Sequence, residues 1–289
     1  MLNGFYNVLK PAGMTSSDVV VKVRGILRHK LGSDAKVGHF GTLDPAGAGV
    51  LPIAVGRAAR LFDYAAQQRK KYRAGFVFGI ETDTLDSYGA VTKTGGTMPL
   101  IEAILAVLPE FTGKICQVPP KYSSKVIEGK RAYDLAREGV EFELKGKNIE
   151  IYNIDYIGRN GDSFVFDVEC SGGTYIRSLG RDIAERLGTV AYMSHIIRLR
   201  SGCFDISEAV TPDEIEASPE KYLLPVEYFT DSVLPRFTVD RAQSAKVLNG
   251  IKLKFKDLPP EAMAVYVDGR LLGIGTNDNG YLKVVTRLI

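Results

Sequence analysis

Between Ser163 and Leu187 the hydrophobic period changes from two to about 3.6, and this change limits the folds open to the chain. Apolar and charged residues alternate up to Cys170, as in a strand with one buried face. Residues 171–174, which read SGGT, turn the chain into a segment whose apolar residues recur every three or four positions from Ile176 onward. A strand that leads directly into an amphipathic helix predicts a domain that mixes strands and helices.

The helix that begins near residue 176 carries Arg177 in its first turn. A cation there opposes the helix dipole, at a cost of a few tenths of a kcal/mol up to about 1 kcal/mol. We therefore expect a negatively charged group close to Arg177, in a structural salt bridge, in a functional site, or in both.

Periodicity and turn residues place the other elements. They predict helices over residues 15–30, 99–108 and 132–138, and strands over 72–80, 195–206 and 281–288. Two apolar runs that flank Asp268-Gly269 predict a β-hairpin. The fold class that follows is α+β, with a compact β unit after about residue 235.

The composition excludes several classes of protein. A chain of 289 residues that is 45% hydrophobic and 25% charged can bury a core, so it is not disordered, and its length suggests roughly two domains. It has no run of 18 apolar residues that would predict a membrane span. The first twenty residues lack the layout of a secretory signal, so we expect a cytoplasmic protein without a membrane partner.

The charge distribution is more informative than the net charge of +3. Residues 1–73 contain twelve Lys and Arg against four Asp, and the last fifty residues contain eight bases against five acids. Residues 205–231 invert this balance, with eight acids and one lysine. Two basic regions predict a discontinuous surface for a polyanion, although solvated surfaces explain the pattern equally well.

Cysteine and histidine spacing does not indicate a metal centre or a disulfide framework. No two of these residues have the close spacing of zinc ligands, and an odd number of cysteines does not suit a set of disulfides. We expect no metal and three buried free thiols, which are Cys116, Cys170 and Cys203.

Residues 36–51, which read KVGHFGTLDPAGAGVL, combine four glycines with one aspartate. Neither G-x-G-x-x-G nor the P-loop pattern fits, so a nucleoside triphosphate site is excluded. Asp44 precedes Pro45 in a segment where the backbone can closely approach a planar ligand. From the residues alone, Asp44 is more readily a turn or capping residue than a functional carboxylate.

Six collinear blocks in the first two hundred residues resemble the TruB family of tRNA pseudouridine synthases. The block GHFGTLDP at 38–45 resembles the catalytic motif of that family. The other five blocks are KPAGMTS at 10–16, KYR at 71–73, TDTLD at 82–86, QVPPKYSSK at 117–125 and GTYIRSL at 173–179. The resemblance implies a catalytic domain of mixed, largely antiparallel sheet flanked by helices over residues 1–232, and a PUA-like RNA-binding domain over residues 233–289.

The resemblance also implies an activity and its residues. The reaction is the isomerisation of uridine to pseudouridine without a cofactor. Asp44 is the implied nucleophile, acting on the sugar carbon or on C6 of the base, and Arg177 is its implied partner. Tyr72 is expected to stack on the flipped-out base and to handle the C5 proton. As a nucleophile, Asp44 must be ionised, which a nearby guanidinium favours.

Further residues are assigned by the same resemblance. His39 is expected to contact the RNA where the base has left, Tyr175 and Ile196 to line the base pocket, and Lys10 to meet phosphates. Lys22, Arg24 and Lys70 are expected to meet phosphates as well.

The implied substrate is the T-arm of tRNA at uridine 55, with the acceptor stem on the C-terminal unit. We expect a monomer that needs no protein partner. Phe40 departs from the small or polar residue usual in the family, so we expect a changed RNA contact beside His39.

Three other hypotheses about the function stay open. The chain could be a guide-RNA-dependent synthase that acts on ribosomal RNA. It could be a non-catalytic RNA-binding or RNA-folding protein. It could be a hydrolase with an aspartate nucleophile, which would need a second carboxyl such as Asp83 or Asp86 near Asp44.

Overall fold

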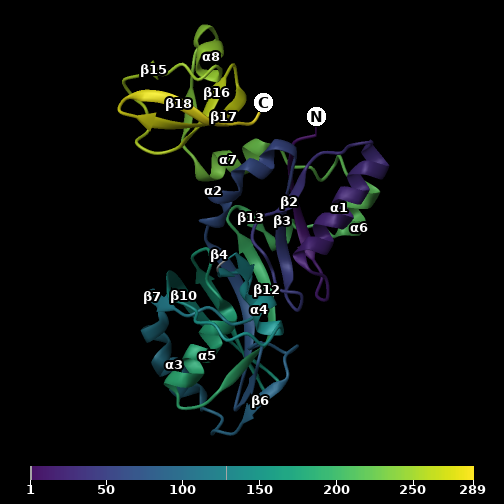
Figure 1. The fold of residues 1–289 in the computed structure, drawn as a ribbon, viewed down its shortest axis with the longest axis vertical. Helices are drawn as coiled ribbons and strands as arrows, with labels where there is room; N and C mark the ends of the chain where they lie inside the picture. The colour runs from purple at the N-terminus through teal and green to yellow at the C-terminus, as the bar shows by residue number, and fades with distance from the viewer. Residues whose placement is uncertain (1, 128) are drawn as a thin grey trace.

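The computed structural model describes residues 2–127 and 129–289. Two sheets dominate it, and Figure 1 shows the larger one in the middle and lower part of the molecule and the smaller, C-terminal one at the top. No helix in the described part of the chain is long and apolar enough to cross a membrane.

The larger sheet has nine strands. In spatial order its main path is β1 (Gly4–Lys10), β3 (Ala48–Val55), β12 (Ala191–Ser201), β4 (Lys70–Phe78), β11 (Ser163–Cys170), β10 (Lys147–Asn160) and β7 (Gly113–Gln117). β2 (Val37–His39) pairs with β3, and β13 (Phe204–Asp205) pairs with β12. Only β3 and β12 run parallel along the path, so the mixed, largely antiparallel sheet that was expected is confirmed.

Helices cover the sheet at two places. α1 (Ser16–Leu31) packs with α6 (Pro212–Ala217) against β1 and β3, and Thr15 caps α1 in a reciprocal pair with Asp18. α5 (Ile176–Arg186) and α3 (Ile101–Val107) close the hydrophobic core over β4, β11 and β12. The remaining short elements of this part are η1 (Gly56–Leu61), α2 (Phe62–Ala66), β5 (Ile80–Thr82), β6 (Val91–Thr94), η2 (Leu108–Phe111), β8 (Val126–Ile127), β9 (Lys130–Arg131), α4 (Ala132–Arg137), η3 (Ile206–Glu208) and α7 (Val226–Val233).

The C-terminal sheet has five strands and a core of its own. In spatial order these are β14 (Arg236–Thr238), β16 (Met263–Val267), β17 (Arg270–Asp278), β18 (Tyr281–Arg287) and β15 (Leu253–Lys254), with α8 (Arg241–Leu248) beside them. The predicted hairpin is confirmed, because Asp268 (φ 46°) and Gly269 (φ 77°) connect β16 to β17 in the left-handed conformation that such turns require.

An aromatic cluster joins the two parts. Phe5 packs on Phe40, Phe204 and Phe229 with ring centroids 5.4–5.6 Å apart, and Tyr266 of β16 belongs to the same hydrophobic cluster. Phe40 is 4% exposed, so it points into the core rather than toward an RNA surface. The changed RNA contact expected beside His39 stays a prediction, because burial of the Phe40 ring does not test what His39 contacts.

Other expectations need correction in detail. The strand predicted over 195–206 is instead β12, which begins four residues earlier, followed by the short β13. Cys170 is buried as expected, but Cys116 is exposed and Cys203 is only partly buried. Cys116 lies on β7, which ends the main path of the sheet, where alternate side chains face solvent.

Candidate active site

Asp44 lies in the loop between β2 and β3, and neighbouring residues fix the position of that loop. Ser16 at the start of α1 donates its hydroxyl to the Leu43 carbonyl and accepts the Leu43 amide, both at 2.9 Å. The Leu43 side chain is buried in the main core. The Gly47 amide closes a turn onto the Asp44 carbonyl at 2.9 Å. Asp44 therefore lies at the surface, directly after a residue whose side chain is buried in the core.

Gly49 explains one glycine of this segment. It has φ 106°, and a Cβ there would lie 2.3 Å from the Arg198 carbonyl oxygen of β12. Only glycine allows β3 to approach β12 this closely.

The carboxylate of Asp44 forms a two-point ion pair with Arg177. Nε of Arg177 lies 2.9 Å from Oδ2, and Nη2 donates to Oδ1 at 3.1 Å. The guanidinium side chain is 7% exposed and the carboxylate side chain 35% exposed. The anionic partner expected for Arg177 is therefore present, and one face of the carboxylate stays open to a ligand.

Further contacts tie Arg177 to two other sequence blocks that resemble family motifs, residues 82–86 and 117–125. Nη1 donates to the Thr84 carbonyl at 2.9 Å and lies 3.6 Å from Oδ2 of Asp86, while Nη2 also donates to the Tyr122 carbonyl at 3.0 Å. Asp86 thus folds near Asp44, on the far side of a shared guanidinium. Blocks far apart in the sequence meet at one buried cation.

Tyr72 lies on β4, where its neighbours across the sheet are Val168 and Arg198. The side chain is buried, and burial raises the pKa of its hydroxyl, an effect that the nearby Arg198 guanidinium opposes. Tyr72 is therefore a neutral phenol at pH 7. Ile196 belongs to the same buried cluster as Leu43 and Tyr72.

Arg198 is a residue of this region that the sequence reasoning missed. Its side chain is fully buried, with Nε donating to Val50 at 2.6 Å, Nη2 to Gly41 at 3.0 Å and Nη1 to Thr42 at 3.4 Å, all through carbonyl oxygens. No ion pair to it occurs within residues 2–127 and 129–289. The alternation of Ile196 with Arg198 on β12 was the available signal, since it places both on the buried face.

Gln117 fixes the backbone of Tyr175 at the start of α5. The Gln117 side-chain oxygen accepts the Tyr175 amide at 2.8 Å, and its nitrogen donates to the Tyr175 carbonyl at 3.1 Å. Tyr175 itself is partly buried, which raises its pKa. The sequence identifies Gln117 only as a member of the block at 117–125. The structure shows that its side chain positions the Tyr175 backbone.

His39 ends β2 on the edge of the same region and is partly buried. Burial, together with the Arg198 and Arg131 guanidinium groups, lowers the pKa of its imidazole. His39 is therefore neutral near pH 7, and it offers a hydrogen-bonding group rather than a positive charge.

The expected phosphate contact of Lys10 is wrong. Its side chain is fully buried, and Nζ donates to the carbonyls of Pro11, Met14 and Pro45 at 2.9, 2.5 and 3.4 Å. Burial lowers its pKa to about 8, against the attraction of Asp44. Lys10 fastens the Asp44 loop from inside.

The other three side chains expected at phosphates have different environments. Lys70 is buried and donates to the Ala66 and Gln68 carbonyls, whereas Lys22 pairs with Asp213 on α6. Arg24 remains exposed on α1. Among the described residues, no group of three or more His, Cys, Asp or Glu side chains is arranged to hold a metal ion.

A family model described as TruB family pseudouridylate synthase (N terminal domain) matches residues 27–176. A curated protein named tRNA pseudouridine synthase B from Clostridium kluyveri is 39% identical, over 98% of this chain and 99% of its own length. A protein of the same name from Symbiobacterium thermophilum is 42% identical, over 86% of this chain and 83% of its own length.

Solved structures share the fold. A chain from a Cbf5-Nop10-Gar1 complex superposes with a TM-score of 0.74 at 25% identity, over 99% of this chain and 85% of that chain. A chain from an H/ACA RNP bound to a substrate RNA containing 2′-deoxyuridine gives a TM-score of 0.73 at 24% identity, with the same coverage. Both similarities extend through the C-terminal sheet.

Proposed function

Because the chain belongs to the TruB family of pseudouridylate synthases, we propose that it converts uridine 55 in the T-arm of tRNA to pseudouridine. The names of the curated relatives support tRNA as the substrate. The observation that carries the proposal is the open carboxylate of Asp44, held at two points by Arg177 where the family's motifs converge.

The reaction is an isomerisation that needs no external reactant. The bond between N1 of uracil and C1′ of the sugar breaks, the base turns, and a bond forms between C5 and C1′. The proton on C5 leaves, and a proton is gained at N1, so atoms and electrons balance. Release of the C5 hydrogen to water is therefore a direct measure of turnover.

Asp44 acts as the nucleophile, on C1′ of the ribose or on C6 of the base. Its carboxylate must be aimed at the substrate, and the two-point contact with Arg177 fixes its orientation. Ser16 and Lys10 hold the loop backbone on either side of the nucleophile. Little reorganisation is then needed when substrate arrives.

The target base has to leave the RNA stack to reach Asp44, which costs a few kcal/mol. Tyr72 stacks on the flipped uracil, and its neutral phenol suits a role in moving the C5 proton. Tyr175 and Ile196 line the apolar side of the base pocket. His39 contacts the RNA at the position that the base has left.

Residues 1–232 form the catalytic domain in this proposal, and residues 233–289 form a PUA-like domain that meets the acceptor stem. The protein acts alone, as a monomer in the cytoplasm. The solved structures that share its fold come from multi-component complexes, so activity without partners distinguishes this proposal from a guide-RNA-dependent one.

The test is tritium release by the purified protein from a T-arm hairpin labelled at C5 of the target uridine. We expect release without any other protein or RNA, and none from a hairpin labelled only at a stem uridine. Release that requires added guide RNA would support the guide-dependent alternative. Absence of release from both the hairpin and whole tRNA, with RNA binding intact, would leave a non-catalytic RNA-binding protein.

A further inference from the structure

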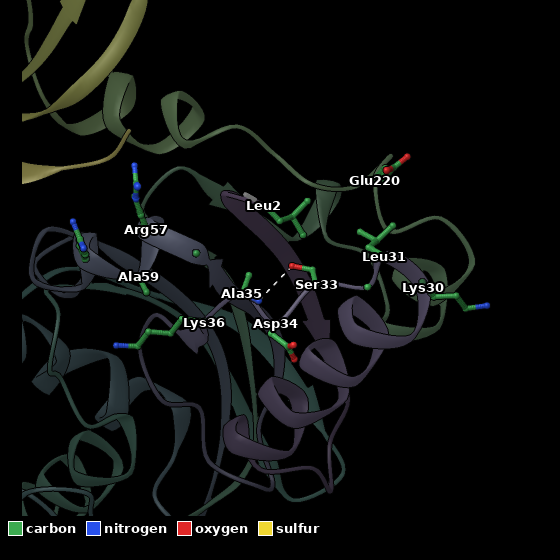
Figure 2. Close-up of a pocket in the computed structure, with 13 residues that line it drawn as sticks. Leu2, Lys30, Leu31, Ser33, Asp34, Ala35, Lys36, Arg57, Ala59 and Glu220 are labelled. Atoms are coloured by element: carbon green, nitrogen blue, oxygen red, sulfur yellow. Dashed lines mark hydrogen bonds between the residues drawn. The ribbon is translucent and has the colours of Figure 1, made fainter.

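A cavity of about 1360 Å³ lies away from Asp44, between the C-terminal end of α1, the segment 31–36 and the start of η1 (Figure 2). None of the residues assigned to catalysis lines it. Leu2 lines the cavity just before β1, while Lys10 at the other end of β1 touches the Asp44 loop. At about 3.3 Å per residue, the two sites are about 25 Å apart.

The cavity is bordered by more cations than anions. Lys30, Lys36, Arg57 and Arg60 line it, against Asp34 and Glu220. The negative charge of Asp34 is already compensated by Arg28, which lies 2.8 Å away and outside the lining. Figure 2 shows Lys30 pointing outward at one end and Arg57 pointing toward the C-terminal sheet at the other.

Two of these cations, Arg57 and Arg60, continue toward the C-terminal sheet. Arg60 donates from Nη1 to the Arg287 carbonyl at the end of β18, at 2.9 Å. Arg57 also lines a smaller cavity of about 280 Å³ together with Leu288 and Ile289. Neither arginine, nor Lys36, has a carboxylate partner in the part of the chain that the structure describes. Their charges stay available to an anionic ligand.

The chemistry of the lining favours a nucleic-acid backbone over a nucleobase. None of the lining residues is aromatic, so the cavity has no surface on which a base could stack. Flexible, exposed cations bind phosphates and position a nucleic acid without reading its sequence.

We propose that Lys36, Arg57 and Arg60 at this cavity bind the sugar-phosphate backbone of the tRNA beyond the hairpin that enters the Asp44 site. The inference rests on the proposed function and adds a second contact region, which bridges the catalytic part and the C-terminal sheet. It accounts for a basic segment that the chemistry at Asp44 does not use. It also explains how the protein can engage two separated parts of an RNA.

The experiment compares whole tRNA with a T-arm hairpin too short to span 25 Å. The variant is Lys36→Gln, Arg57→Gln, Arg60→Gln, and the control removes three charges from other elements of the catalytic part, by Lys93→Gln on β6, Lys114→Gln on β7 and Arg186→Gln on α5. All six side chains lie at least partly exposed, so both variants should fold. The dissociation constant is measured for each RNA as a function of salt concentration.

For whole tRNA we expect the cavity variant to bind at least tenfold more weakly, and the slope of log affinity against log salt to fall by about 2–3, near 0.9 for each lost phosphate contact. Hairpin binding and tritium release from the hairpin should match those of the wild type. Unchanged tRNA binding would overturn the inference, and so would equal losses in the cavity and control variants. Failure of the wild type to release tritium would instead contradict the proposed function.

Discussion

Arg177 and Asp44 meet at two points, with Nε 2.9 Å from Oδ2 and Nη2 3.1 Å from Oδ1. The same guanidinium donates to the carbonyls of Thr84 and Tyr122. Three segments, at Asp44, Thr84 and Tyr122, therefore depend on one buried side chain. The orientation of the carboxylate is set by the fold rather than by the substrate.

Replacing Arg177 with lysine tests whether the planar shape of the guanidinium matters in addition to its positive charge. Lysine keeps the positive charge but lacks the planar fork, so it cannot hold both carboxylate oxygens and both carbonyls. Losing two charge-assisted hydrogen bonds, at about 1.5–3 kcal/mol each, predicts a fall in kcat of at least about a hundredfold. Steady-state tritium release at saturating hairpin measures kcat, and filter binding should show hairpin affinity within threefold of wild type. Equal kcat for the two proteins would contradict the role given to the fork.

Arg198 should act as a positioning residue for the Asp44 loop. Arg198→Met leaves the Gly41 and Val50 carbonyls without their donor, which should lower the free energy of unfolding by about 2–4 kcal/mol. Urea unfolding measures that loss. Arg198→Lys should fold better than the methionine variant but still show a reduced kcat, with little change in hairpin affinity. A wild-type kcat in Arg198→Lys would remove the positioning role.

Two glycines of the same motif should respond differently to alanine. Gly49→Ala places a methyl group 2.3 Å from a backbone oxygen at φ 106°, so it should cost at least about 2 kcal/mol of stability and most of the activity. Gly38→Ala meets no atom within 4 Å and needs no positive φ, so it serves as the control. Thermal unfolding and tritium release of both variants test this. If both variants lost the same stability and activity, the close approach of β3 to β12 at Gly49 would not explain the loss.

Stability should depend on pH through Lys70. Burial lowers the pKa of Lys70 from 10.5 to about 8, so between these values the unfolded chain holds a proton that the folded protein does not. The contribution of Lys70 to stability therefore rises with pH from about 8 to 10.5, by up to roughly 3 kcal/mol. The reference is Lys70→Arg, which cannot lose its charge in this range. Urea unfolding of both proteins across this range should show the difference growing with pH; a constant difference would contradict it.

The predictable part of the fold is the part with strong local periodicity. Apolar and charged residues alternate from Ser163 to Cys170, and the structure has the strand β11 there. After Thr15 apolar residues recur at helical spacing, and the structure has the helix α1 there. The Asp268-Gly269 turn was equally recognisable, because its backbone conformation depends on local residues. In contrast, β12 begins before the predicted residue, since its pairing with β4 extends over residues with no clear alternation of their own.

The candidate site was predictable only where a motif named its residues. Asp44 and Arg177 are 133 positions apart, and only the resemblance and an unfavourable helix charge suggested that they meet. Lys10 was assigned to phosphates by the family resemblance, whereas tertiary contacts bury it beneath the Asp44 loop. Arg198 was missed because an arginine is usually exposed, so its alternation with Ile196 on β12 was not taken as a sign of burial.

The most direct test of the account compares wild type with Asp44→Asn on a T-arm hairpin carrying tritium at C5 of the target uridine. Asparagine keeps the size of the side chain and can still bond to Arg177, but it cannot act as a carboxylate nucleophile. We expect tritium release to fall to background in the variant, while its dissociation constant for the hairpin stays within threefold of wild type. Release from Asp44→Asn at a rate near that of the wild type would contradict the assignment of Asp44 as the nucleophile.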